Sequence, residues 1–276
     1  MVDAGSCTLK KQPNLAYIEI EIRQDALTED AVSHELLHAL FIQKGFGQIG
    51  YNAIEGMPFP QIAILLHSVI EHRSIYARQI AMGIDIVPTQ KHKATTIFRN
   101  IADEPRVIDH SFVVNALLLL DCLIGANEYR ELFMARIMRF FSHTYELADR
   151  LEKRLFAKDI DSPQVFRQTF ITGLEICDEF LRQYIAGNAP YGGLQENISI
   201  SYLPTEFELQ QKVREVFDFR ETFNSFIIIS KKDKQASYIL TKANNIDNIM
   251  KITVEDFIAK TDRIKPERAW INREQH

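Results

Sequence analysis

Alternating apolar and polar positions near the start of the chain predict a strand that is followed closely by a helix. Residues 15–23 (LAYIEIEIR) place isoleucine at every second position from residue 18, which is the period of a half-buried strand. Thr28 then offers an N-cap, and the two acidic residues after it suit the first turn of a helix. This helix is expected over residues 29–44, with Gly45 as its stop.

Helical periodicity dominates the chain from there to about residue 186. Residues 45–60 are rich in Gly, Pro and Asn and are expected to form a loop, and a second helix is predicted over residues 61–82. Further helical signals fill residues 91–186, and residues 128–155 within them indicate one long amphipathic helix. Three breaks interrupt these signals: Pro105, Gly125 and residues 159–163.

The pattern changes after Gly187, where NAPYGG (residues 188–193) predicts a turn or linker. Short strand-like runs follow at residues 198–203, 226–230 and 237–241, the last two joined by a hairpin turn at KKDKQ. Two more helices are predicted: residues 205–217 and 254–261. The expected fold class is mostly α with a small sheet (α+β). Residues 1–187 are expected to form a helical domain and residues 188–276 a small α+β C-terminal module, which could pack as part of one domain.

Composition favours an ordinary globular protein and argues against several other classes. The 276 residues are 46% hydrophobic and carry a net charge of −5, so a sizeable core is expected without the basic excess of a nucleic-acid binder. Cys7, Cys122 and Cys177 are too scattered for a disulfide framework, and the longest apolar run, residues 112–120, is too short to span a bilayer. No apolar leader opens the chain. We therefore expect a cytoplasmic protein with no nucleic-acid or membrane partner, and the sequence does not indicate an oligomeric state.

The segment SHELLHALF, residues 33–41, carries the most specific chemical signal. His34 and His38 lie four apart, so a helix projects both imidazoles from one face, about one turn apart. Two such nitrogens can bind one Zn²⁺. Glu35 can reach a water on that metal without being a ligand, and zinc lowers the pKa of such a water. The spacing thus predicts two metal ligands and a general base that passes a proton to a leaving amine.

The surroundings of this motif favour a metal site over two incidental histidines. The predicted helix is well capped and apolar around the motif, so buried imidazoles would need partners. A strand precedes it closely. With these features, the segment resembles the zincin metallopeptidases, in which a strand, a helix bearing HExxH and a third ligand form the site. The resemblance covers about the first third of the chain, and it implies a zincin-like catalytic unit with Zn²⁺ as the cofactor.

The third ligand is expected from outside the motif. The extended HExxHxxGxxH form of the metzincins is absent, because Phe41 and Lys44 stand at the positions of its Gly and its third His. The resemblance is therefore to the gluzincins, in which a Glu on a following helix is the third ligand. It implies Glu71, in the helix predicted over residues 61–82, as the third metal ligand.

Several assignments stay open within this resemblance. His67 and His72 compete with Glu71 for the third ligand position. More distant candidates are Asp109, His110 and His143. Many gluzincins carry an acidic residue four positions after the Glu to orient a metal-bound His, but this chain has Ile75 there. The group that would stabilise a tetrahedral oxyanion also has several candidates: Tyr76, His143 and Tyr191.

The predicted function is a cytoplasmic zinc-dependent hydrolase, most concretely a metallopeptidase with a peptide or protein substrate. It is loosely similar to the ImmA/IrrE type of intracellular HExxH protein, a likeness at the level of the fold. One alternative is a non-catalytic or regulatory protein-binding module with a structural or vestigial zinc site. It predicts four protein ligands, such as His34, His38, His67 and Glu71. Another is a metal hydrolase with a non-peptide substrate, because HExxH geometry activates water without dictating the bond attacked.

Overall fold

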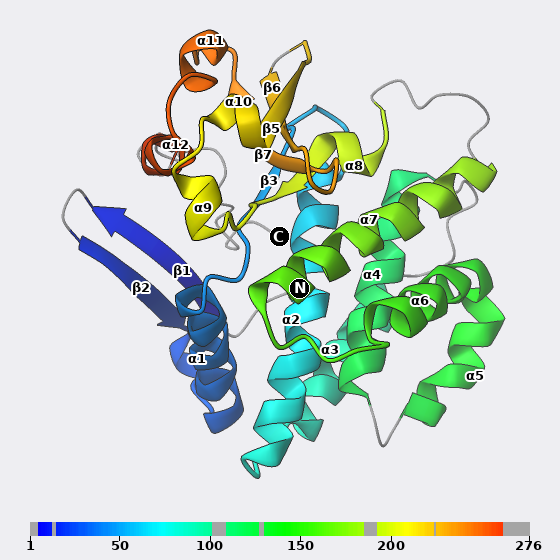
Figure 1. The fold of residues 1–276 in the computed structure, drawn as a ribbon. Helices are drawn as coiled ribbons and strands as arrows, with labels where there is room; N and C mark the ends of the chain where they lie inside the picture. The colour runs from blue at the N-terminus through cyan, green and yellow to red at the C-terminus, as the bar shows by residue number, and fades with distance from the viewer. Residues whose placement is uncertain are drawn as a thin grey trace.

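Helices make up most of the protein, and small antiparallel sheets complete it (Figure 1). The computed structural model describes residues 5–12, 15–100, 109–126, 130–184, 192–223 and 225–261. The longer helices are α1 (Glu29–Gln43), α2 (Phe59–Ala81), α3 (Val87–Asn100), α4 (His110–Gly125), α5 (Arg130–Phe140), α6 (Ser142–Leu155), α7 (Pro163–Tyr184) and α12 (Val254–Thr261). The short helices are η1 (Gln24–Ala26), α8 (Leu194–Asn197), α9 (Glu206–Leu209), α10 (Val213–Val216) and α11 (Ile246–Ile249).

The strands of the described residues pair within three separate sheets. The sheets are β1 (Gly5–Gln12) with β2 (Leu15–Ile22), β3 (Ile49–Tyr51) with β4 (Ile198–Ile200), and β5 (Phe217–Glu221), β6 (Ser225–Ser230) and β7 (Ala236–Thr241) in that order. All pairings are antiparallel. The structure therefore confirms the predicted fold class, mostly α with small sheets.

The helix that carries the HExxH segment begins and ends within one residue of its prediction. Thr28 caps α1 by accepting a backbone hydrogen bond in the first turn, and Gly45 beyond its end has a φ of 77°. α1 lies against α2, where the side-chain amide of Gln79 donates to the carbonyl of Asp30 and to the hydroxyl of Ser33, both at 2.8 Å. Gln79 is 1% exposed. This buried amide therefore fixes how α1 lies along α2.

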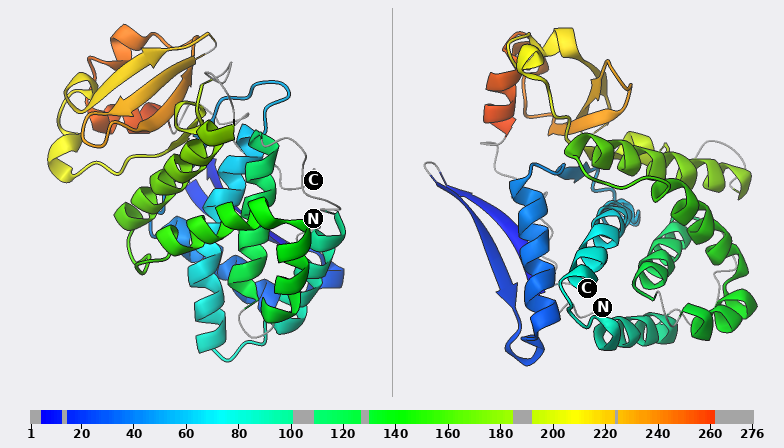
Figure 2. Two further views of the ribbon diagram at one scale, coloured as in Figure 1. Left: turned by 90° about the vertical axis from the view of Figure 1, so that its right-hand side faces the viewer. Right: turned by 60° about the horizontal axis from the view of Figure 1, so that its bottom comes forward.

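A β-hairpin lies along α1 on the side away from most other helices (Figure 2). Its second strand, β2, confirms the strand predicted before α1. Its first strand, β1, pairs with β2 from Gly5↔Ile22 to Gln12↔Leu15 and is absent from the sequence prediction. The segment GSCTLKKQ lacks a clean alternation of apolar and polar residues, so periodicity alone does not reveal it.

α2 is the helix around which the main hydrophobic core is built. It contacts α1, α4 and α7, and it runs through the middle of the helical part (Figure 1). Phe59, Leu66 and Ile70 of α2 are fully buried. The structure confirms the helix predicted over residues 61–82, which begins two residues earlier and ends one residue earlier than predicted. None of the helices in the described ranges is both long and apolar enough to cross a membrane.

The single helix predicted over residues 128–155 is wrong. α5 ends at Phe140 and α6 begins at Ser142, because Phe141 between them has a φ of −138°, outside the helical range. The side chain of Phe141 is 2% exposed, and its ring centroid lies 6.2 Å from that of Phe98 in the core. The backbone N–H of Phe141 still donates to the carbonyl of Ile137, and its carbonyl still accepts from Tyr145. Burial of the ring contributes about 1.5–3 kcal/mol, which favours this local geometry.

The helix predicted over residues 205–217 is also wrong. Thr205 starts a helical turn with a capping box, but this turn, α9, is only four residues long. The backbone at Lys212 forms a bridge with Thr253, and Phe217 begins β5, which pairs with β6. Sheet pairing thus satisfies backbone groups that a continuous helix would have satisfied, and it buries Phe217 completely.

The other C-terminal predictions fare better. β6, β7 and the turn between them match the predicted hairpin, and Lys234 in that turn has a φ of 59°. The predicted strand over residues 198–203 is shortened to β4, and α12 matches its prediction. The turn or linker predicted over residues 188–193 lies largely outside the described residues.

The described residues form two hydrophobic cores, and the division between them falls between Ile200 and Tyr202 in the sequence. The larger core reaches from Leu37 to Ile200, and the smaller core reaches from Tyr202 to Phe257. The smaller core lies in the part coloured yellow to red, at one end of the helical part (Figures 1 and 2). The predicted domain boundary at residue 187 falls outside the described residues and stays a prediction.

Arg167 of α7 joins the two parts. Its guanidinium forms an ion pair with Asp233 at 3.0 Å and donates to the hydroxyl of Ser237 at 3.3 Å and to the carbonyl of Ile200. It also lies over the ring of Tyr202, 5.3 Å from the centroid. The Arg167 side chain is 8% exposed, so these contacts are largely shielded from water.

We expect Arg167→Met to lower the free energy of unfolding by about 2 kcal/mol, because it leaves buried acceptors without their donor. Urea denaturation of the purified protein measures this change. Arg150→Met is the matched control, because Arg150 forms an exposed pair with Glu179 at 3.6 Å and should contribute less than about 0.5 kcal/mol. Equal effects of the two substitutions would contradict the role given to Arg167.

Candidate metal centre

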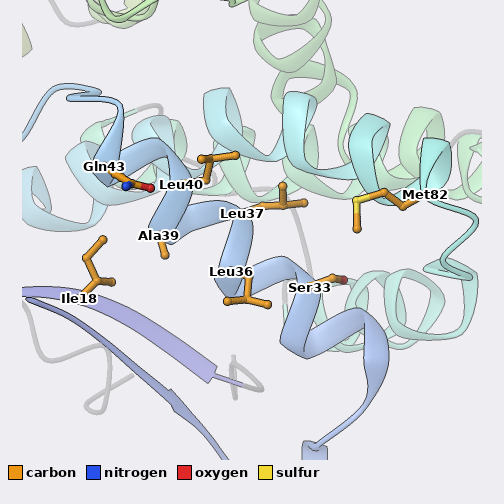
Figure 3. Close-up of a pocket in the computed structure, with 8 residues that line it drawn as sticks. All are labelled: Ile18, Ser33, Leu36, Leu37, Ala39, Leu40, Gln43 and Met82. Carbon is orange, nitrogen blue, oxygen red and sulfur yellow. The ribbon is translucent and has the colours of Figure 1, made fainter.

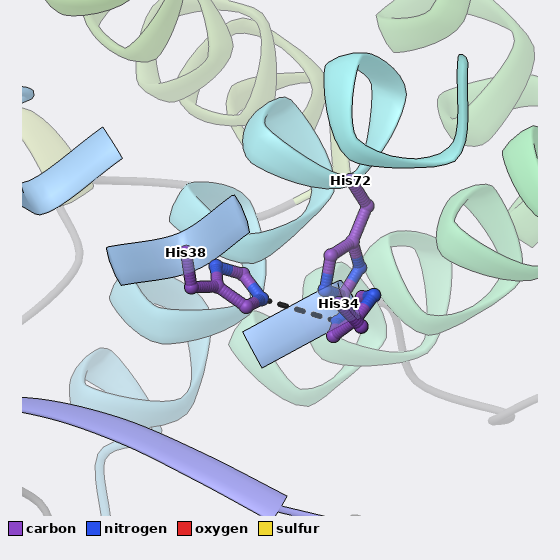
Figure 4. A group of neighbouring side chains, drawn as sticks. All are labelled: His34, His38 and His72. Atoms are coloured by element: carbon purple, nitrogen blue, oxygen red, sulfur yellow. Dashed lines mark hydrogen bonds between the residues drawn. The ribbon is translucent and has the colours of Figure 1, made fainter. Parts of the chain in front are cut away.

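Three histidines meet where α1 and α2 touch. His34 and His38 lie on α1, and His72 lies on α2 (Figure 4). One ligand atom from each lies within 4.8 Å of the others. His38 and His72 are buried, and His34 is half-buried. The described part of the chain therefore contains a buried cluster of three histidines that could bind a metal ion.

The two histidines of the HExxH segment converge as ligands of a single ion would. Nε2 of His34 and Nε2 of His38 are 3.1 Å apart, the contact drawn in Figure 4. Two imidazole nitrogens bound to one Zn²⁺ at 2.0–2.1 Å in a tetrahedral site lie about 3.3 Å apart. Imidazole also suits zinc, copper, iron and nickel, so the donor set fits a divalent transition metal.

The outer nitrogens of two of these rings are held by buried carboxylates. Nδ1 of His38 donates to Oε2 of Glu71 at 2.8 Å, and Nδ1 of His72 donates to Oδ1 of Asp121 at 2.7 Å. A carboxylate acceptor keeps the proton on Nδ1 and leaves the Nε2 lone pair available to a metal. Carboxylate–histidine pairs of this kind orient metal ligands and raise their basicity.

Burial favours the neutral form of two of the clustered imidazoles, those of His34 and His72. It lowers the pKa of His34 well below the ordinary value, and the neighbouring His38 and His72 lower it further. Burial also lowers the pKa of His72, because its effect exceeds the opposing effect of Asp121. A metal binds the neutral imidazole, so protons compete weakly for these two nitrogens at neutral pH.

Asp121 belongs to a buried network that reaches α3 and α4. Oδ2 of Asp121 lies 2.6 Å from the ammonium of Lys93, which also donates to the hydroxyl of Tyr76 at 3.2 Å. Burial alone would raise the pKa of Asp121, but Lys93 and His72 lower it well below its usual range. The ring of Tyr76 stacks on His72, with the centroids 5.1 Å apart. The network thus surrounds the outer side of His72.

Glu71 lies behind His38, outside the cluster of three. Its carboxylate bonds to Nδ1 of His38 and lies 3.5 Å from Nδ1 of His67. Nε2 of His67 in turn donates to the carbonyl of Gly47 at 3.0 Å. Burial would raise the pKa of Glu71, but His67 and His38 lower it well below its usual range. The assignment of Glu71 as the third ligand stays a prediction, and the structure places His72, one of the alternatives, with His34 and His38.

The more distant candidates do not join this cluster. Asp109 caps α4, and His110 is buried with its ring edge-on to Phe59. His143 has an exposed side chain on α6. Tyr191 lies outside the described residues. The hydroxyl of Tyr76 is engaged by Lys93, next to Asp121 on the Nδ1 side of His72, and the role of Tyr76 as an oxyanion-stabilising group stays a prediction.

Glu35 lies directly after His34 on α1 and is 5% exposed. A helix turns about 100° per residue, so Glu35 projects from α1 beside the face that carries His34 and His38. This is the place that the general base occupies in the HExxH arrangement. Its catalytic role stays a prediction.

Sequence reasoning missed Asp121 and Lys93. Asp121 was visible in the sequence as an acid within the apolar run that continues to residue 124, and a buried acid needs a partner. That signal could have marked it as a member of a polar site. Lys93 carries no comparable signal, because lysines on an amphipathic helix are ordinary.

An apolar groove of about 420 Å³ lies beside α1, between that helix and β2 (Figure 3). Ile18, Leu36, Leu40 and Met82 contribute to its lining, and the three clustered histidines do not. The groove is therefore separate from the candidate metal centre.

Comparisons with known proteins do not assign the chain to a family. No family matches its sequence, no curated protein matches it, and no solved structure matches its fold.

We expect the purified protein to bind about one equivalent of Zn²⁺, because three convergent imidazoles suffice for a zinc site. Elemental analysis by mass spectrometry measures the metal content. His34→Ala should lose the metal, whereas His92→Ala, which changes an exposed histidine on α3, should retain it. A folded wild-type protein that stays free of metal after incubation with zinc would contradict the site.

Proposed function

We propose that the protein is a zinc-dependent hydrolase, most concretely a metallopeptidase that acts on a peptide or protein substrate. One observation carries this proposal: a helix bearing HExxH presents both histidines to a third, and two of the three rings are held by buried carboxylates. Incidental histidines rarely have this support, because a buried ionised carboxylate is costly unless it is paired. The close approach of β2 and α1 is consistent with a zincin-like unit.

The proposed metal ligands are His34, His38 and His72. Glu71 then orients His38, and Asp121 orients His72. This choice differs from the gluzincin pattern, in which Glu71 would itself bind the metal. Zinc is the proposed cofactor because three neutral imidazoles are a common donor set for catalytic zinc and leave a position for water.

When bound, zinc supplies a Lewis acid and makes a water molecule nucleophilic at neutral pH. Glu35 is the proposed general base, which would accept a proton from the attacking water and pass it to the leaving amine. His34 is the least buried of the three histidines, so a substrate would approach the metal from its side. The carboxylates behind His38 and His72 hold the ligands in place, so that little reorganisation is needed.

The alternative of a closed structural zinc site has weaker support. A set made of His34, His38, His67 and Glu71 would need a free nitrogen on His67. Nε2 of His67 bonds to the carbonyl of Gly47, and its Nδ1 faces Glu71. Each nitrogen of His67 is therefore directed at a group of the protein.

We expect His72→Ala to abolish tight zinc binding, and Glu71→Gln to weaken it by about 10–100-fold without abolishing it, because an orienting carboxylate is less critical than a ligand. Zinc affinity measured by competition with a chromophoric chelator separates the two. The opposite order, with Glu71→Gln losing the metal and His72→Ala retaining it, would restore the gluzincin assignment.

We expect Glu35→Gln to retain zinc and to lower peptide hydrolysis by at least about 100-fold, because a glutamine cannot accept the proton. The assay is cleavage of a mixed peptide library followed by mass spectrometry. Glu29→Gln is the control, because Glu29 is exposed in the first turn of the same helix. Cleavage by Glu35→Gln at the wild-type rate would rule out this mechanism.

A further inference from the structure

The ammonium of Lys93 lies one step further out than the groups that hold the histidines. Among the described residues, no hydrogen bond joins it to a clustered histidine. It contacts two residues that themselves contact His72: Asp121 through its carboxylate and Tyr76 through its ring. Its Nζ lies 2.6 Å from Oδ2 of Asp121 and 3.2 Å from the hydroxyl of Tyr76. Lys93 thus contacts both the carboxylate that accepts a hydrogen bond from His72 and the tyrosine whose ring stacks on His72.

The two oxygens of Asp121 have separate partners. Oδ1 accepts from Nδ1 of His72, and Oδ2 accepts from Lys93. With both oxygens bound, rotation of the carboxylate would break two short charge-assisted contacts at once. The carboxylate therefore has one strongly preferred orientation, and so has the ring of His72.

The ring of Tyr76 adds a second restraint. It stacks on His72 at 5.1 Å and on His34 at 5.8 Å between centroids, with interplanar angles of 28° and 29°. Lys93 holds the hydroxyl of this tyrosine. One cation on α3 thereby fixes groups on α2 and α4 that together define where His72 lies.

The Lys93 side chain is 17% exposed and the Asp121 side chain is 4% exposed. A lysine placed there for solubility would turn its ammonium to the solvent. Here the ammonium turns inward to a carboxylate that already serves a histidine, at a cost in desolvation. In return, a buried pair with good geometry specifies one arrangement of the surrounding side chains.

We propose that Lys93 is a positioning residue of the metal centre: through Asp121 it sets the orientation in which His72 presents Nε2 to a divalent metal. This inference rests on the proposed assignment of His72 as a ligand. Lys93 is not a catalytic residue, because it reaches the site only through Asp121 and Tyr76.

The test measures the Zn²⁺ affinity of the metal-free full-length protein by competition with a chromophoric chelator. We expect Lys93→Met to weaken binding by about 10–100-fold, the usual effect of disturbing the groups around metal ligands. Lys91→Met is the matched control, because Lys91 lies two residues away on the same helix with an exposed side chain. The visible spectrum of the Co²⁺ form should change in Lys93→Met and stay as in wild type in Lys91→Met.

A double-mutant cycle separates positioning from general destabilisation. If Lys93 acts through Asp121, then Asp121→Asn should weaken zinc binding, and adding Lys93→Met to it should weaken binding less than about 3-fold further. Additive losses in the double variant would overturn the proposal, and so would an unchanged affinity in Lys93→Met.

If Lys93→Met does not fold, Lys93→Arg and the double variant still decide the matter. Lys93→Arg keeps the cation and should bind zinc within about 3-fold of wild type. The double variant leaves no ion of the pair unpartnered, and it should match Asp121→Asn in affinity. A double variant that binds zinc as tightly as wild type would overturn the proposal. Failure of the wild type to bind zinc would instead reject the proposed function itself.

Discussion

Two imidazoles buried side by side, those of His38 and His72, need a partner at their outer nitrogens, and this need organises the contact between α1 and α2. An N–H group that leaves water costs free energy unless it finds an acceptor. Glu71 meets this need for His38, and Asp121 meets it for His72. Because both acceptors bind Nδ1, both rings turn Nε2 toward the cluster. The same two hydrogen bonds that lower the cost of burying these rings therefore also direct their Nε2 atoms, which could bind a metal, toward one another.

The neighbouring positions of Glu71 and His72 explain how one helix serves both sides of the cluster. Successive residues of a helix point about 100° apart. Glu71 can thus lie behind His38 while His72 enters the cluster beside it. α2 supplies one candidate metal ligand, His72, and through Glu71 it orients another, His38, which belongs to α1. The buried amide of Gln79 fixes α1 against α2 and keeps the two helices in the register that this division requires.

The sequence could predict the parts of this site that depend on local structure. The cap, the apolar periodicity and the four-residue spacing of His34 and His38 all act within one helix, and α1 follows them. Whether Glu71 or His72 lies with these histidines depends on the rotation of α2 about its axis, which tertiary packing sets. The role of Asp121 depends on a partner 49 residues away. A local sequence pattern contains no information on contacts between residues so far apart in the chain. The break at Phe141 was missed for the same reason, because it depends on burial of that ring beside Phe98.

The segment after α1 links the candidate metal centre to the rest of the fold. The carbonyl of Gly47 accepts from His67, which lies against Glu71, the partner of His38. A Cβ at Gly47 would lie 2.7 Å from the side chain of Ile200, so this segment packs tightly on β4. β4 pairs with β3, and it also contacts β7 of the C-terminal sheet. A continuous series of hydrogen bonds and packed side chains thus runs from the C-terminal part to the carboxylate behind a proposed ligand. A shift of that part against α7 would have to be absorbed along this series, because packed interiors deform little.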